Sequence, residues 1–264
     1  MRSLLALYKW LADRPSYMLL TACDERLEAQ KPARFRYAWI GLMGLAVLAG
    51  LALIGVWSVV WRICNDWDRL SRPAAVTAVV MLVWPMRRAL VSIGPSLRFR
   101  DRANQMAVAA AAAALVGVGF MSLVDRYPYA TDYPMPGFIG WIRPQLSIFR
   151  VLLLMPVWGA WSMLISVQFL RPNEVTDPIT RRFARGCGPL AAAACMAPPL
   201  IGTIVYFHYM VPPGQIVITG GTVFTAIVSG PILCRIGGGI TRRALLAGNM
   251  ITQIFFLMLC TIWL

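Results

Sequence analysis

The chain has 264 residues, of which 59% are hydrophobic and only 14% are charged, against roughly 25% charged residues in a soluble globular domain. Because a soluble fold of this size needs a charged surface, the composition excludes one and predicts an all-α, polytopic transmembrane helical bundle. The net charge of +14 does not indicate a nucleic-acid partner, because the arginines flank apolar segments and do not gather in one polar domain.

Residues 1–37 are predicted to form an N-terminal arm on the cytoplasmic surface of the membrane. Apolar residues between Leu4 and Leu11 follow the spacing of one helical face, which is typical of an amphipathic helix that lies in the interface. Lys9 interrupts the apolar stretch, so a signal peptide is not predicted. A mixed-charge stretch follows at 16–30, and a docking surface for a soluble partner is the alternative function for it.

Seven apolar segments follow this arm in the predicted transmembrane domain, 38–264. The second segment is the weakest, because its apolar part stops before Arg87 and Arg88. It is retained as a span because the arginines that follow it would otherwise lie outside the membrane. The predicted spans are 38–61, 74–93, 104–124, 148–170, 186–209, 216–234 and 245–264.

Positive charge is sorted by side of the membrane. Of the 25 lysine and arginine residues, 19 fall on the arm and on the connections 87–103, 171–185 and 235–243. Because cytoplasmic loops carry an excess of positive charge, the sequence predicts an N-terminus inside and a C-terminus outside. The expected location is a bacterial cytoplasmic (inner) membrane, with an organellar inner membrane as the alternative, and the basic side is expected to contact anionic lipids.

Several kinds of chemistry are excluded by the composition of the spans. Acidic residues are missing at mid-depth, which counts against proton relays and ion-coupled carriers. His208 is the only histidine, so bis-histidine haem ligation and a three-histidine metal site are excluded within the chain. No covalent haem or zinc motif is present, and lipid contacts are expected. His208 is interpreted as part of an aromatic girdle at the outer end of the fifth span, or as a pH-sensitive or quinone-contacting group.

Four aspartates on the predicted outer side are the candidates for catalysis. Residues 65–73 (NDWDRLSRP) resemble the aspartate-rich metal–diphosphate loop of membrane prenyltransferases, with Asp66 and Asp68 as its acidic residues. A second pair, Asp125 and Asp132, is predicted on the same side. The resemblance implies a lipid- or prenyl-modifying enzyme, although those enzymes work at the cytoplasmic face. The alternative is that these are solvated loop acids that pair with nearby arginines.

Polar residues inside the spans are predicted to hold helices together. Asn249 and Gln253 are four residues apart and share a helical face, and Gln168 lies near the end of the fourth span. Polar groups in lipid bond across helices, so interhelical packing is the interpretation, with a substrate site as the alternative. Cys187 and Cys195, eight residues apart, are predicted to share a face of one helix.

Small residues and helix breakers give two further expectations. Gly41, Gly44 and Gly50 in the first span, and the alanine run in the third, are predicted to permit close helix approach. Prolines and glycines are predicted to interrupt the fifth and sixth spans, as in transporters, and the three glycines at 237–239 to form a tight turn. Trp57 is predicted at the headgroup level.

The leading hypothesis from the sequence is a non-enzymatic integral membrane subunit or scaffold of a larger membrane protein complex, with other membrane subunits as its partners. The first alternative is a transporter or permease component that works with a separate ATPase, because no nucleotide-binding motif occurs in the chain. The second alternative is the lipid- or prenyl-modifying enzyme that uses the outer aspartates.

Overall fold

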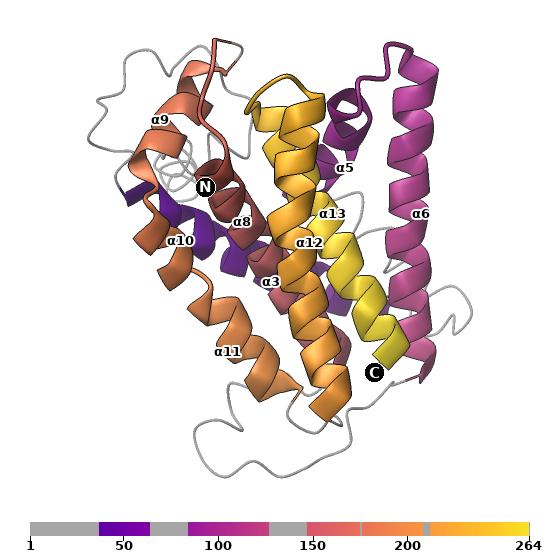
Figure 1. Cartoon of the computed structure of the whole chain (residues 1–264). Coiled ribbons are helices and arrows are strands. Elements are labelled where there is room, and N and C mark those ends of the chain that lie inside the picture. Colours follow the sequence, from indigo (N-terminus) through magenta and orange to yellow (C-terminus); the bar gives the residue numbers. More distant parts are fainter. Residues whose placement is uncertain (1–36, 64–83, 127–146, 175, 208–211, 264) are drawn as a thin grey trace, which may run out of the picture.

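The protein is described by a computed structural model, which covers residues 37–63, 84–126, 147–174, 176–207 and 212–263. Within these ranges the regular elements are helices and no strand occurs, as Figure 1 shows. In chain order the helices are α3 (Ala38–Ile63), α5 (Trp84–Ser96), α6 (Arg102–Arg126), α8 (Ser147–Phe169), α9 (Pro178–Gly186), α10 (Pro189–Ala194), α11 (Ala197–Tyr206), α12 (Pro212–Ile236) and α13 (Arg242–Trp263).

The expectation of an all-α polytopic bundle is confirmed. In the described part of the chain, six helical stretches are long and apolar enough to cross a membrane: α3, α6, α8, the pair α10–α11, α12 and α13. They coincide with six of the seven spans expected from the sequence. For the second expected span, residues 74–83 lie outside the described residues. The rest of that span lies in α5, which has 13 residues and continues to Ser96. Full crossing by 74–93 therefore stays a prediction.

Helix α8 forms the centre of the bundle. In its membrane-spanning stretch 83% of the residues are buried, against 28% in α3 and in α6. It contacts α3, α10, α11, α12 and α13, and its buried side chains include Val151, Met155 and Trp158. A helix that is apolar on all sides is typical of a membrane span, and its contacts with the neighbouring helices place this one at the centre.

Proline interrupts only one of the spans in the described structure. The fifth span divides into α10 and α11 at Cys195–Met196, just before Pro198 and Pro199, whose rings remove two consecutive amide donors. The expected interruption of the sixth span is wrong, because α12 runs without a break through its glycines and Pro231. One proline removes one helical hydrogen bond, and neighbouring helices tolerate this loss inside a membrane.

Three connections that carry arginine lie at the same end of the bundle. Figure 1 shows the end of α5 and the start of α6, all of α9, and the turn between α12 and α13 at this end, with the C-terminal end of α13 at the other. This grouping agrees with the sorting of positive charge between alternate connections. We call this end of the molecule the basic end.

Only some of the small residues that were expected to permit close helix approach lie at helix contacts. A β-carbon on Gly50 would lie 2.8 Å from the carbonyl oxygen of Leu153, so α3 and α8 touch there through their backbones, whereas Gly44 faces open space. Most of the alanine run on α6 is exposed. The ring of Trp57 is buried and its centroid lies 6.3 Å from that of Phe120, and its expected place at the headgroup level stays a prediction.

Candidate functional site

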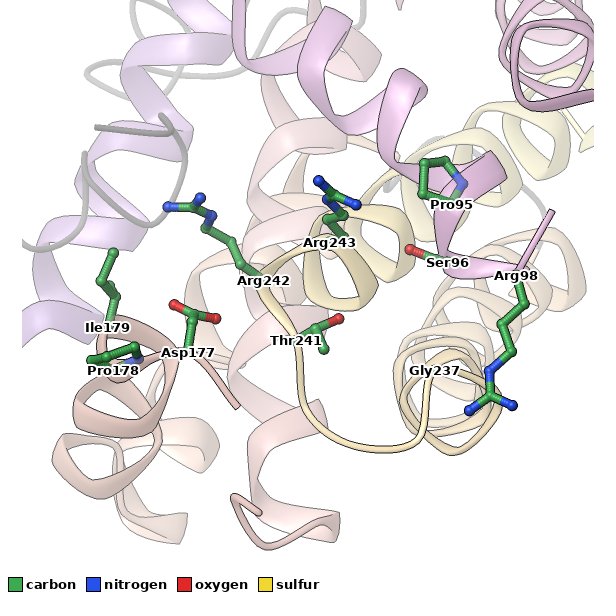
Figure 2. A pocket seen from close by; sticks show the side chains of 10 residues that line it. All are labelled: Pro95, Ser96, Arg98, Asp177, Pro178, Ile179, Gly237, Thr241, Arg242 and Arg243. Carbon is green, nitrogen blue, oxygen red and sulfur yellow. The ribbon is translucent and has the colours of Figure 1, made fainter. Parts of the chain in front are cut away.

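A cavity of about 520 Å³ opens at the basic end of the bundle. Four helix ends surround it: the last turn of α5, the first turns of α9 and α13, and the end of α12. Figure 2 shows the side chains that line it. They are Pro95, Ser96, Arg98, Asp177, Pro178, Ile179, Gly237, Thr241, Arg242 and Arg243.

The turn between α12 and α13 forms one wall of the cavity. Gly238 and Gly239 have φ angles of 78° and 155°, which L-residues rarely adopt and glycine tolerates. The amide of Gly239 donates to the carbonyl oxygen of Cys234 at 2.8 Å and closes the end of α12. The side chain of Asn173 donates to the carbonyl oxygen of Gly238 at 2.7 Å. The expected tight turn at 237–239 is therefore confirmed, and it is tied to the segment before α9.

The first turn of α9 forms the opposite wall. Asp177 caps this helix, because its carboxylate accepts a hydrogen bond from the amide of Thr180 at 3.2 Å, and Pro178 occupies the first helical position, where no amide donor is needed. Arg181 donates from its guanidinium to the carbonyl oxygen of Asn173 at 2.8 Å. These local contacts hold the wall in place without using the arginines of the cavity.

Positive charge dominates the lining of the cavity. Arg98, Arg242 and Arg243 stand against one carboxylate, that of Asp177. Figure 2 shows Arg242 and Arg243 extending upward in the view from the start of α13, Arg242 to the left and Arg243 beside Pro95 of α5, while Arg98 extends downward from the end of α5 past the turn at Gly237. Thr241 accepts a hydrogen bond from the amide of Ala244 at 3.2 Å and so caps α13.

The middle of the bundle contains the predicted packing residues Asn249 and Gln253. Both side chains are buried on α13, and Gln253 donates to the side-chain oxygen of Asn249. Asn249 donates in turn to the sulfur of Met163 on α8 at 3.2 Å. A β-carbon on Gly159 would lie 2.5 Å from the Asn249 oxygen, so the absence of a side chain at position 159 makes room for the pair.

A second polar contact joins α12 and α13. The hydroxyl of Ser229 lies 3.4 Å from the hydroxyl of Thr252 and from the carbonyl oxygen of Gly248. Thr252 donates to the same carbonyl oxygen at 2.9 Å. The hydroxyl of Ser166 on α8 donates to the carbonyl oxygen of Ser162 on its own helix. These hydroxyls are thus bound to backbone carbonyl groups and to each other.

Helix α8 donates hydrogen bonds to both helices of the fifth span. The indole of Trp161 donates to the carbonyl oxygen of Ala192 at 2.9 Å, and the indole of Trp158 donates to the hydroxyl of Thr203 at 3.0 Å. Broken helices in membranes need such partners, because a free carbonyl group in hydrocarbon costs several kcal/mol. The two tryptophans of α8 thus bond to both helices of the fifth span.

Two further contacts lie at the two ends of α8. Arg150 is buried at the start of α8, and its guanidinium donates to the carbonyl oxygen of Tyr206, the last residue of α11, at 3.0 Å. A cation at a helix C-terminus is favoured by the helix dipole. Gln168 donates to the carbonyl oxygen of Cys187 at 2.9 Å, so it joins the end of α8 to the segment between α9 and α10.

Most of the residues that the sequence proposed for chemistry lie outside the described structure. Asp66, Asp68, Asp132 and His208 are outside the described residues, and of Asp125 only the helical backbone, in α6, is described. Among the described residues, no group of three or more histidine, cysteine, aspartate or glutamate side chains is placed to hold a metal ion.

The expected position of the two cysteines on one helix is wrong. Cys187 follows the end of α9 and Cys195 follows the end of α10, so a break in the helix lies between them. Gly188 and Pro189 produce this break, because the proline starts a new helix with its fixed φ angle. Both thiols are buried and are not joined in a disulfide.

Sequence reasoning missed the basic cavity as a site. Arg98, Arg242 and Arg243 entered only the count of charges that decides orientation. One signal was present: two arginines open α13 and its first turn carries no acid, whereas the helix dipole favours acidic residues at this position.

The fold places this chain among integral membrane proteins built as helical bundles. Comparison with models of protein families, with curated proteins and with solved structures found no match.

Proposed function

We propose that this protein is a non-enzymatic integral membrane subunit or scaffold of a larger membrane protein complex. The observation that carries the proposal is the outward face of α6. Ala107, Ala110, Ala111 and Ala114 are all exposed and follow one another at the spacing of a single helical face. Such a row of small side chains permits another transmembrane helix to approach closely.

The interior of the bundle also supports this function over transport. A transporter is expected to place polar groups or open backbone around a substrate at its broken helices. Here the carbonyl oxygen of Ala192, just before the break, and the hydroxyl of Thr203 on α11 bond to tryptophans of α8. The buried amide of Gln253 donates to that of Asn249, and Asn249 donates to the sulfur of Met163. These polar groups hold helices together inside the bundle. Contacts with partner subunits are therefore left to the exposed faces of its helices.

The orientation and location that we propose follow from the charge. The basic end faces the cytoplasm and the C-terminal end of α13 faces outward, since arginine-rich connections stay on the cytoplasmic side. The membrane is the bacterial cytoplasmic membrane. In this orientation the exposed alanine face of α6 lies in the hydrocarbon layer, where its partner is a transmembrane helix of another subunit.

Isolation in a mild detergent tests the proposed function. A tagged chain is extracted from its own membranes and analysed by size-exclusion chromatography and mass spectrometry. Other membrane proteins are expected to co-elute in fixed proportion to it. The double variant Ala110→Trp and Ala114→Trp is expected to lose them, because two indoles on the alanine face block close approach.

A matched control places the same bulk on another exposed surface. Ile216 on α12 is 70% exposed, so Ile216→Trp is expected to retain the partners. Recovery of the wild-type chain as a stable monomer, or equal retention of partners by the alanine-face variant, contradicts the proposed function.

A further inference from the structure

We propose that the cavity at the basic end is a binding site for the phosphate group of an anionic phospholipid. The inference goes beyond the proposed function, because it names a ligand and a site that assembly with other subunits does not require. It rests on the position of the cavity, on the charge of its lining and on the arginines at the start of α13.

The cavity lies at the depth of the lipid headgroups. Its lining residues are within a few positions of the ends of membrane-spanning helices: Gly237 follows α12, which ends at Ile236, and Arg242 begins α13. Lipid phosphate groups stand at this level, next to the hydrocarbon layer. A volume of about 520 Å³ has room for a headgroup and its phosphate.

Two arginines of the cavity are left without a partner in the described part of the chain. The side chains of Arg98 and Arg243 make no hydrogen bond or ion pair with any described residue. The one acidic residue of the lining, Asp177, accepts from the amide of Thr180 with one of its two carboxylate oxygens, and its single negative charge stands against three arginines. Guanidinium groups bind phosphate oxygens through paired hydrogen bonds, so these two side chains have the chemistry for a phosphate anion.

The start of α13 adds positive character to the same place. A helix N-terminus presents unbonded amide groups and a partial positive charge of roughly half an elementary charge, and it binds phosphate readily. The sequence puts Arg242 and Arg243 there and no acid. Two cations at a helix N-terminus destabilise it by themselves, and a bound anion removes that penalty.

Thr241 completes the set of donors. Its hydroxyl oxygen accepts from the amide of Ala244, and no acceptor for its hydroxyl hydrogen occurs among the described residues. The hydroxyl of Ser96, in contrast, donates to the carbonyl oxygen of Ser92 at 2.7 Å. Thr241 therefore has a donor to offer a phosphate oxygen at the point where the arginines of α13 begin.

The test measures thermal stability of the full chain in neutral detergent with added ligand. Phosphatidylglycerol is expected to raise the Tm of the wild-type chain, and phosphatidylcholine is expected to raise it much less. In the double variant Arg98→Gln and Arg243→Gln, the apparent affinity for phosphatidylglycerol is expected to fall about tenfold or more, because two charge-assisted contacts are lost. Arg185→Gln, at an exposed arginine of α9 outside the cavity, is expected to bind as the wild-type chain does.

Two more measurements complete the test. The first separates the effect of guanidinium geometry from that of charge, and the second distinguishes a lipid phosphate from free inorganic phosphate. The variant Arg98→Lys and Arg243→Lys keeps the charge that fixes orientation, but loses the planar guanidinium, so it is expected to fold normally and to bind phosphatidylglycerol several-fold more weakly. Inorganic phosphate alone is expected to have no effect at millimolar concentration. A stabilisation by inorganic phosphate that the same arginine variants abolish supports the site with a water-soluble phosphate as its source.

Three results would overturn the site. The first is equal stabilisation of the wild-type chain and both double variants by phosphatidylglycerol. The second is an equal loss of affinity in Arg185→Gln, which indicates a diffuse basic surface. The third is a wild-type Tm that neither lipid nor phosphate changes, together with a lower Tm of the glutamine variant. This result indicates that acidic groups of the protein itself occupy the cavity.

Discussion

Gly248 of α13 and Gly230 of α12 meet backbone to backbone: a β-carbon on Gly248 would stand 2.9 Å from the Cα atom of Gly230. This contact lies beside the hydroxyl contacts of Ser229 and Thr252. Without a hydrophobic effect between helices in lipid, such close packing is a main source of association. The pair of glycines therefore sets the distance between two of the most extensively packed helices.

Gly248→Ala is expected to destabilise the protein by about 1–3 kcal/mol, because the new methyl group meets backbone that has no room to move. The loss outweighs the gain of about 1 kcal/mol in helix propensity. Thermal denaturation in detergent measures it. Gly220→Ala is the control, since Gly220 on α12 faces open space, and it is expected to be neutral or stabilising. Equal behaviour of the two variants would contradict the close contact.

Trp161→Phe is expected to destabilise the protein by about 1–3 kcal/mol, because it leaves the carbonyl oxygen of Ala192 buried without a donor. Denaturation measurements on Trp263→Phe supply the control, since Trp263 is 42% exposed at the end of α13. A stability of Trp161→Phe equal to that of this control would show that the break in the fifth span does not depend on the indole.

Asn249 and Gln253 are expected to show coupled contributions to stability. In a double-mutant cycle with Asn249→Ala and Gln253→Ala, the coupling energy is expected to be about 0.2–0.5 kcal/mol, the range of side-chain pairs four residues apart on one helix. The cycle is measured by denaturation in detergent. A coupling energy of zero would show that the hydrogen bond between the two side chains does not stabilise α13.

Arg150 is expected to depend on charge for its role at the end of α11. Arg150→Gln loses the favourable interaction with the helix C-terminus and is expected to cost about 2 kcal/mol of stability, whereas Arg150→Lys retains part of it. Thermal denaturation compares the two variants. Equal losses in both would show that the shape of the guanidinium matters and the helix dipole does not.

The orientation of the chain is open to chemical labelling. In a chain whose six natural cysteines are replaced by serine, a cysteine at the exposed Glu174 is expected to react with an impermeant maleimide only after cells are opened. A cysteine in place of Trp263, at the other end of the bundle (Figure 1), is expected to react in intact cells. The reverse pattern would invert the proposed topology.

The spans were predictable because each depends on local composition. Apolar stretches of about 20 residues cross a bilayer wherever they occur, and α3, α6, α8, α12 and α13 follow the expected limits within about four residues. The interruption of the sixth span was not predictable, because tolerance of Pro231 depends on the neighbours of α12. The burial of Trp57 against Phe120 was not predictable either, because Phe120 belongs to another helix.

The pairing of Asn249 with Gln253 illustrates the limit of spacing arguments. Their shared face was evident from a separation of four residues, but their partner Met163 and the space left by Gly159 belong to another helix. The basic cavity shows the same limit. Arg98 and Arg243 are far apart in the chain, and only helix packing brings the ends of α5 and α13 to one cavity.

The sequence by itself determined the class of protein and the alternation of basic and apolar segments, because hydropathy and charge act locally on each segment in a bilayer. Only the tertiary structure decided that α8 is central, that its tryptophans bond to both helices of the fifth span, and that arginines from separate helix ends share a cavity. Those features depend on which helices touch. In lipid that choice is made by the fit of individual side chains such as Gly50, Gly230 and Gly248.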